Sequence, residues 1–215
     1  MVRVLVPCLL ALSLSGCGLS SSSLTAGFAD SGQPSSALPP SRTVKGDVVA
    51  LNDSPTPRKV DDRAPKGTFE RAPSGALADR DYSATALEPE KARELINAYR
   101  KQNGLKPLRL NAALTEAAKS HSRDLAKWDR ISHFGSDGSN PWDRVKRAGF
   151  NAKVAAENVG TGQASIAEVL KGWQNSPGHN KNLLLADADQ MGIALVQDPK
   201  TEFKTFWTLV VGSSL

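Results

Sequence analysis

Histidine and glutamate side chains are the groups in this sequence best suited to chemistry. Its three histidines are His121, His133 and His179, and Glu157 lies between the last two. Neutral imidazole binds divalent transition metals and also serves as a general base. Two imidazoles and one carboxylate could hold zinc or another divalent ion with a position left for water, or form a polar site that binds no metal. Because His133 and His179 are far apart in the sequence, only the fold could bring them together.

Ser176 suggests a second kind of chemistry, in which His179 activates a serine hydroxyl and Glu157 orients the histidine. The following Pro177-Gly178 has a simpler interpretation as the end of a helix. The Gly-x-Ser-x-Gly pattern of many hydrolases is not found in this sequence. We therefore assign no catalytic residue, and we leave open whether the protein is an enzyme.

The remaining histidine and the tryptophans are better suited to packing. His121 shares a helical face with apolar residues, so we expect a core histidine bonded to a backbone or carboxylate partner. Three of the four tryptophans are expected to be packing anchors. Trp173, which precedes the turn at Ser176, is the tryptophan best placed to contact a ligand.

These residues must be positioned by helices, and helical periodicity begins abruptly after Thr85. Asparagine and serine predict the N-caps, and Ser165 with Glu168 has the spacing of a capping box. Asn103-Gly104 and Pro177-Gly178 predict helix ends. We therefore expect four helices, which begin near Pro89, Asn111, Asn140 and Ser165.

Three other segments are expected to be extended: about Val154 to Val159, Met191 to Gln197 and Phe203 to Val211. The last two are separated by a turn at Asp198-Pro199 and are predicted to form a hairpin. Helices and strands mixed in this way, without regular alternation, predict an α+β fold in which helices pack on an antiparallel sheet.

Short motifs surround the candidate residues in a distinctive order. They are Ala118-Lys119-Ser120-His121-Ser122, Ile131-Ser132-His133-Phe134, Glu157-Asn158-Val159, Trp173-Gln174-Asn175-Ser176, Ser176-Pro177-Gly178-His179-Asn180, Lys181-Asn182-Leu183-Leu184, Met191-Gly192-Ile193 and Phe206-Trp207. This order resembles bacterial members of the CAP family of extracellular proteins, whose eukaryotic relatives include cysteine-rich secretory proteins, venom allergens and plant pathogenesis-related proteins. The resemblance covers about residue 87 to the C-terminus.

The resemblance implies an α/β/α sandwich with a central, mainly antiparallel sheet. It also implies a cleft lined by two histidines and two acidic residues. By motif, His133 and His179 match the two histidines and Glu157 matches the first acid. The second acid has no counterpart here, because Asn175 or Ser176 occupies its region.

The first residues have the features of an export signal. Arg3 precedes an apolar run from Val4 to Leu14 that is too short to cross a bilayer. The run ends in Leu14-Ser15-Gly16-Cys17, which resembles the lipobox of bacterial lipoproteins, so Cys17 is the expected lipidation site. The sequence thus predicts a signal peptide over residues 1–17, a linker over 18–86 and a CAP domain over 87–215.

Composition and charge favour a tethered protein of the cell envelope. Residues 18–86 are rich in Ser, Pro, Gly and Ala without a sustained period, which is typical of a disordered tether. Residues 87–215 hold eighteen basic and fourteen acidic side chains without a basic run, so no nucleic-acid partner is expected. The expected partner is the membrane, reached through the lipid anchor. Gly18 resembles the residue that follows the cysteine in outer-membrane lipoproteins of Gram-negative cells.

Three functions are compatible with these features. The leading hypothesis is a non-enzymatic module that binds a small-molecule, lipid, glycan or protein ligand in the His/Glu cleft, because the second acid is missing. The alternative is a metal-assisted hydrolase of an envelope peptide or glycan, with His133 and His179 as ligands and Glu157 as third ligand or general base. The third is a structural envelope protein.

Overall fold

The computed structural model describes residues 62–215, so Cys17, the signal peptide and residues 18–61 of the linker lie outside the described part. Its centre is a four-stranded sheet with the strand order β2-β5-β6-β4. The strand β6 (Thr205–Ser214) pairs antiparallel with β4 (Ala152–Thr161) on one side and with β5 (Gln190–Gln197) on the other. The short β2 (Arg109–Leu110) runs parallel to β5. The sheet is mainly antiparallel, as the sequence predicts.

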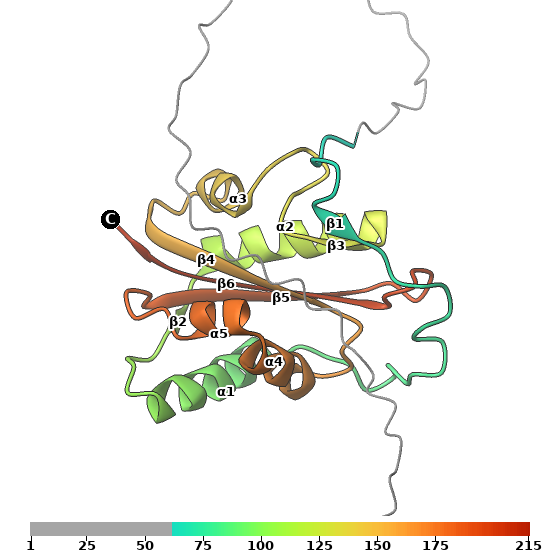
Figure 1. Ribbon diagram of the computed structural model, residues 1–215. Coiled ribbons are helices and arrows are strands. Elements are labelled where there is room, and N and C mark those ends of the chain that lie inside the picture. The colour runs from blue at the N-terminus through green and yellow to red at the C-terminus, as the bar shows by residue number, and fades with distance from the viewer. Residues whose placement is uncertain (1–61) are drawn as a thin grey trace, which may run out of the picture.

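Helices cover both faces of this sheet and form the three layers that the family resemblance implies (Figure 1). One face carries α2 (Ala112–Trp128) and α3 (Pro141–Arg147). The opposite face carries α1 (Pro89–Gln102), α4 (Ile166–Asn175) and α5 (Pro177–Leu183). No helix within residues 62–215 is long and apolar enough to cross a membrane.

Strand β6 shows how the two helical layers share one sheet. Its Leu209 and Val211 belong to the apolar cluster on the α1 side, whereas Val210 belongs to the cluster on the α2 side. Successive side chains of a strand point to opposite faces, so a strand covered on both faces is apolar throughout. This explains why the segment was recognisable as a strand without alternating polarity.

Side-chain caps start the helices close to where the sequence predicts them. Asn111 accepts a hydrogen bond from the backbone N–H of Leu114, and Ser165 accepts one from Glu168. The predicted helix end at Pro177-Gly178 is confirmed, since α4 ends at Asn175, but Pro177 also begins α5, a helix that the sequence did not predict. Proline fits the first position of a helix, where its missing N–H needs no partner.

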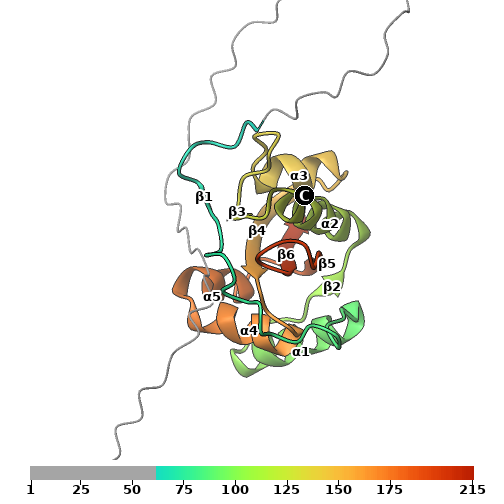
Figure 2. The same ribbon diagram turned by 90° about the vertical axis from the view of Figure 1, so that its right-hand side faces the viewer.

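Residues 62–86, which we call the strap, pack against the domain although the sequence assigns them to the linker. Within the strap, β1 (Phe69–Glu70) pairs with β3 (Ile131–Ser132), and the Tyr82 hydroxyl donates a hydrogen bond to the Gly162 carbonyl at 2.9 Å. Figure 2 shows the strap running along one end of the sandwich, from the α3 layer to the α4 layer.

Arg130 shows how closely the strap fits the domain. Its side chain is fully buried, lies 2.7 Å from the Asp62 carboxylate and stacks over the ring of Phe69 at 5.0 Å. Leu77 packs against the apolar cluster that contains Phe206. The expectation of a flexible linker therefore does not hold for the strap, because single apolar side chains that fill gaps in another surface leave no period in the sequence.

Candidate functional site

Five polar side chains from five parts of the fold meet around β4. We call them the Glu157 cluster: His121 on α2, His133 after β3, Arg144 on α3, Glu157 on β4 and His179 on α5. β4 is the outer strand of the sheet, so helices from both layers can reach it. The structure thus brings together the three residues that the sequence predicts to converge, which are His133, Glu157 and His179.

Glu157 is the centre of the cluster and is saturated with donors. Its side chain is only 2% exposed, and one nitrogen of the Arg144 guanidinium lies 2.9 Å and 2.8 Å from its two oxygens. His133 Nδ1 lies 3.0 Å from one of these oxygens. Burial alone would raise the pKa of Glu157, but Arg144 and the hydrogen bond from His133 hold that pKa well below its usual range. Glu157 is therefore a buried, fully paired carboxylate.

His133 is oriented by this carboxylate. Because an ionised carboxylate only accepts hydrogen bonds, Nδ1 must carry the proton, which leaves the lone pair of neutral His133 on Nε2. The Arg144 guanidinium also donates to the His133 carbonyl at 2.9 Å. The His133 side chain is 16% exposed, whereas that of its partner Glu157 is 2% exposed. Of these two residues, His133 is the one that is accessible from outside.

Hydrogen bonds to backbone carbonyls position His179 next to β4. The Asn158 amide donates to the His179 carbonyl at 3.0 Å, and the Asn182 amide donates to the Glu157 carbonyl at 3.0 Å. The ring centres of His133 and His179 are 6.5 Å apart, with their planes inclined at 52°. Two asparagines from the predicted motifs thus hold α5 against β4.

His121 is the core histidine that its helical position predicts. Its side chain is fully buried, and Nε2 lies 2.8 Å from the Ser132 carbonyl and 3.5 Å from a Glu157 oxygen. Burial lowers the pKa of His121 to about 4, so the ring is neutral at neutral pH and donates from Nε2. A pocket of about 140 Å³ adjoins this ring on the side of α2 and α3 and is lined by Ser120, His121, Asp124, Gly135, Ser136, Asp137, Ser139, Arg144 and Arg147.

Trp173 and Ser176, the other two candidates, have different positions. Trp173 is fully buried, and its indole N–H donates to the Val159 carbonyl at 3.0 Å. It is therefore a packing anchor, and the prediction that it contacts a ligand needs correction. Ser176 joins α4 to α5 and its carbonyl accepts a hydrogen bond from the Asn180 N–H at 2.8 Å. A role of its hydroxyl beside the histidines stays a prediction.

Comparison with known proteins identifies the family. Residues 93–211 match the Cysteine-rich secretory protein family, known as CAP, over more than half of the chain. The chain belongs to this family. It is 34% identical over 139 residues to the uncharacterized protein YkwD of Bacillus subtilis, with 62% of this chain and 54% of YkwD covered. It is 27% identical over 121 residues to the uncharacterized membrane protein YlbC of the same organism, with 56% of this chain and 35% of YlbC covered. The chain thus spans about half or less of these relatives.

Solved structures show the same CAP fold. An outer surface protein of Borrelia burgdorferi aligns with a TM-score of 0.53 and 20% identity over 60% of this chain and 97% of that one. An extracellular protein with an SCP domain from Bacillus anthracis aligns with a TM-score of 0.52 and 23% identity over 61% of this chain and 45% of that one. At these identities the likeness concerns the fold alone.

The predicted three-ligand metal site does not fit this CAP domain. A cation bound to Glu157 would lie beside the Arg144 guanidinium, which already occupies both carboxylate oxygens. Each zinc–nitrogen bond is about 2.1 Å long, and the nitrogen lies about 1.1 Å from the centre of its ring. Two imidazoles bound to one tetrahedral zinc ion would therefore have their ring centres about 5 Å apart. The observed separation of 6.5 Å is longer. Within residues 62–215, no group of three histidine, cysteine or acidic side chains is placed to hold a metal ion.

Arg144 is the member of the cluster that sequence reasoning did not find. It lies in the predicted helix after Asn140, and its side chain is only 4% exposed. A charged side chain is rarely buried without a partner, so a partner was to be expected only once its burial was known. The sequence contains no signal that distinguishes Arg144 from its neighbours Lys146 and Arg147 on the same short helix.

Proposed function

We propose that this protein is an extracytoplasmic, envelope-anchored CAP-domain module that binds a ligand or partner beside His133 and His179. The observation that carries this proposal is the complete pairing of Glu157 with Arg144 and His133. A carboxylate with a pKa well below its usual range is a poor proton acceptor. With the second family acid also missing from the sequence, no carboxylate is available in the cluster as a general base or as a third metal ligand.

The spacing of the two imidazoles is compatible with one oxygen between them, although His179 is itself only 1% exposed. An oxygen that forms hydrogen bonds of about 2.8 Å to two rings at a tetrahedral angle would place the ring centres about 6.4 Å apart. The observed distance is 6.5 Å. A hydroxyl or carboxylate oxygen of a glycan, lipid, small molecule or protein has this chemistry, so the proposed ligand class is an oxygen-bearing group that enters next to the exposed edge of His133.

Membrane attachment is the second part of the proposal and rests on the N-terminal sequence. A short apolar run and Leu14-Ser15-Gly16-Cys17 precede the domain, and they lie outside the described residues. Acyl chains on Cys17 would anchor the protein in the envelope, and Gly18 supports the outer membrane in a Gram-negative cell. Fatty-acid labelling that persists after Cys17→Ser would contradict this part alone.

Native purification from the envelope tests the ligand site. Mass spectrometry of small molecules and metals that co-purify is compared for the parent chain, His133→Gln and the matched control Lys127→Gln on the exposed end of α2. We expect an oxygen-rich molecule with the parent and the control, and its loss with His133→Gln. Equal recovery from all three chains contradicts the proposed site. A stoichiometric metal, together with a hydrolytic activity that a chelator abolishes, would instead support the hydrolase.

A further inference from the structure

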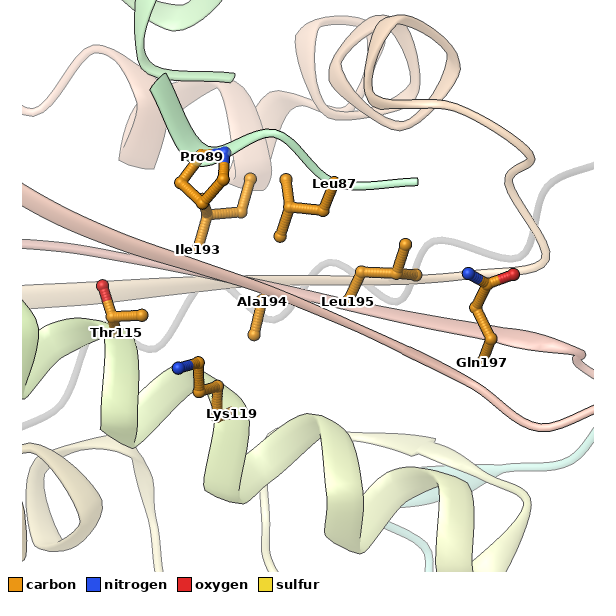
Figure 3. Close-up of a pocket in the computed structure, with 8 residues that line it drawn as sticks. All are labelled: Leu87, Pro89, Thr115, Lys119, Ile193, Ala194, Leu195 and Gln197. Atoms are coloured by element: carbon orange, nitrogen blue, oxygen red, sulfur yellow. The ribbon is translucent and has the colours of Figure 1, made fainter. Parts of the chain in front are cut away.

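The outer edge of β5 forms the floor of a second recess, which we call the β5 groove (Figure 3). The start of α1 borders it on one side and α2 borders it on the other. Its volume is about 380 Å³, which lies within the range of ligand-binding pockets. It shares no residue with the Glu157 cluster, and its lining consists of Leu87, Pro89, Thr115, Lys119, Ile193, Ala194, Leu195 and Gln197.

The floor of the groove is an unpaired strand edge. β2 pairs with β5 only at Gln190 and Met191, and the chain then turns away into α2. The Met191 carbonyl faces this edge, because it accepts a hydrogen bond from the Asn111 N–H at 2.8 Å. Backbone groups alternate in direction along a strand, so the N–H and C=O groups of Ile193 and Leu195 face the same edge. Ile193 is only 1% exposed, whereas Leu195 is partly exposed, so the accessible part of this edge lies at Leu195.

Two contacts bound the groove along the strand. At one end, a Cβ atom on Gly192 would lie 2.1 Å from the backbone nitrogen of Thr115, so α2 packs directly on β5 there. At the other end, the Gln197 side chain donates to the Thr85 carbonyl at 2.9 Å. With a rise of about 3.3 Å per residue, the edge between these contacts accommodates an extended segment of about four residues.

The charge in the groove indicates the composition of that segment. Most of its lining is apolar, and Lys119 is its one charged residue. Lys119 is exposed and forms no ion pair with a carboxylate of residues 62–215. An occupant with apolar side chains and one acidic side chain would match both features.

We propose that the β5 groove binds an extended peptide by strand addition, with backbone hydrogen bonds to Leu195 and an acidic side chain next to Lys119. This interaction goes beyond the ligand site proposed above and does not depend on it. Backbone pairing would supply the affinity, and the lysine would select acidic over basic sequences.

Single-residue hydrogen exchange on the full chain in detergent tests the proposal. The probe is a pool of acetylated, amidated heptapeptides with Val, Leu or Thr at six positions and Glu at the seventh, and the control pool carries Lys instead of Glu. We expect saturating Glu peptides to slow exchange of the Leu195 amide by at least roughly tenfold. Lys119→Glu should weaken binding of the Glu pool by about two- to fivefold, as for an exposed ion pair, whereas Lys127→Glu should not.

Three outcomes would overturn the proposal. One is unchanged exchange at Leu195 with either pool at millimolar concentration. Another is equal protection by peptides that are N-methylated at every position, because these have no backbone N–H group to donate to the strand. The third is equal binding of the Glu and Lys pools, which would leave Lys119 without the proposed role.

Discussion

The Glu157 cluster and the β5 groove represent opposite ways of building a site. The cluster joins side chains from five elements around one buried carboxylate, with His133 and Arg144 within hydrogen-bonding distance of it. The groove is made by one strand edge between two helices and contains a single charge. Changes in the cluster should therefore alter the stability of the whole domain, whereas changes in the groove should alter binding with little effect on stability.

Removal of Arg144 should have the largest effect. Arg144→Met leaves Glu157 buried without its main partner, and we expect a loss of about 3–5 kcal/mol in the free energy of unfolding, measured by urea denaturation. The matched control is Arg147→Met on the same helix, because the exposed pair of Arg147 with Asp137 should contribute about 1 kcal/mol or less. The double change Arg144→Met with Glu157→Gln should recover part of the loss. Equal effects of the two single arginine changes would contradict the central role of Glu157.

Acid should weaken the cluster next. Folded His121 has its pKa lowered to about 4 from an ordinary value of 6.5, so the unfolded chain binds this proton more readily. Stability should therefore fall as the pH decreases from 6.5 to 4, by up to about 3 kcal/mol from this group. The lowered pKa of Glu157 adds a further loss only below its ordinary value of 4.5. Urea denaturation at several pH values above 5 separates the effect of His121 from that of Glu157. If the stability of the His121→Gln variant depends on pH as strongly as that of the parent chain, His121 is not the group responsible.

Loss of the strap should have a smaller effect. A chain that begins at residue 87 lacks the half-buried Phe69 and Leu77 and exposes Arg130, so we expect it to be about 2 kcal/mol less stable than a chain that begins at residue 62. The thermal transitions of both chains measure the difference. Identical transitions would mean that the strap contacts do not stabilise the domain.

The smallest effect is expected in the groove. Lys119→Glu changes an exposed side chain without an ion pair to residues 62–215, so the free energy of unfolding should change by about 0.5 kcal/mol or less. Urea denaturation of Lys119→Glu and Arg144→Met under the same conditions compares their free energies of unfolding directly. A loss as large as that of Arg144→Met would show that the groove and the cluster do not differ as described.

Much of this fold was predictable because its signals are local. The caps at Asn111 and Ser165 mark helix starts, and the turn at Asp198-Pro199 separates β5 from β6. Convergence of His133 with His179 was predictable only from the family resemblance, since their own spacing is not a motif. The roles of Arg144 and the strap depend on contacts between distant segments, which no local pattern records.

The strap also determines how far the domain could stand from a membrane. An acyl anchor on Cys17 would leave residues 18–61 as the connection to the strap, and an extended chain of this length spans at most roughly 150 Å. The span to residue 86 would be at most roughly 240 Å. Because Asp62 is held at Arg130, the tether would pull on the end of the sandwich next to His133. That end of the domain would face the anchoring bilayer when the tether is taut.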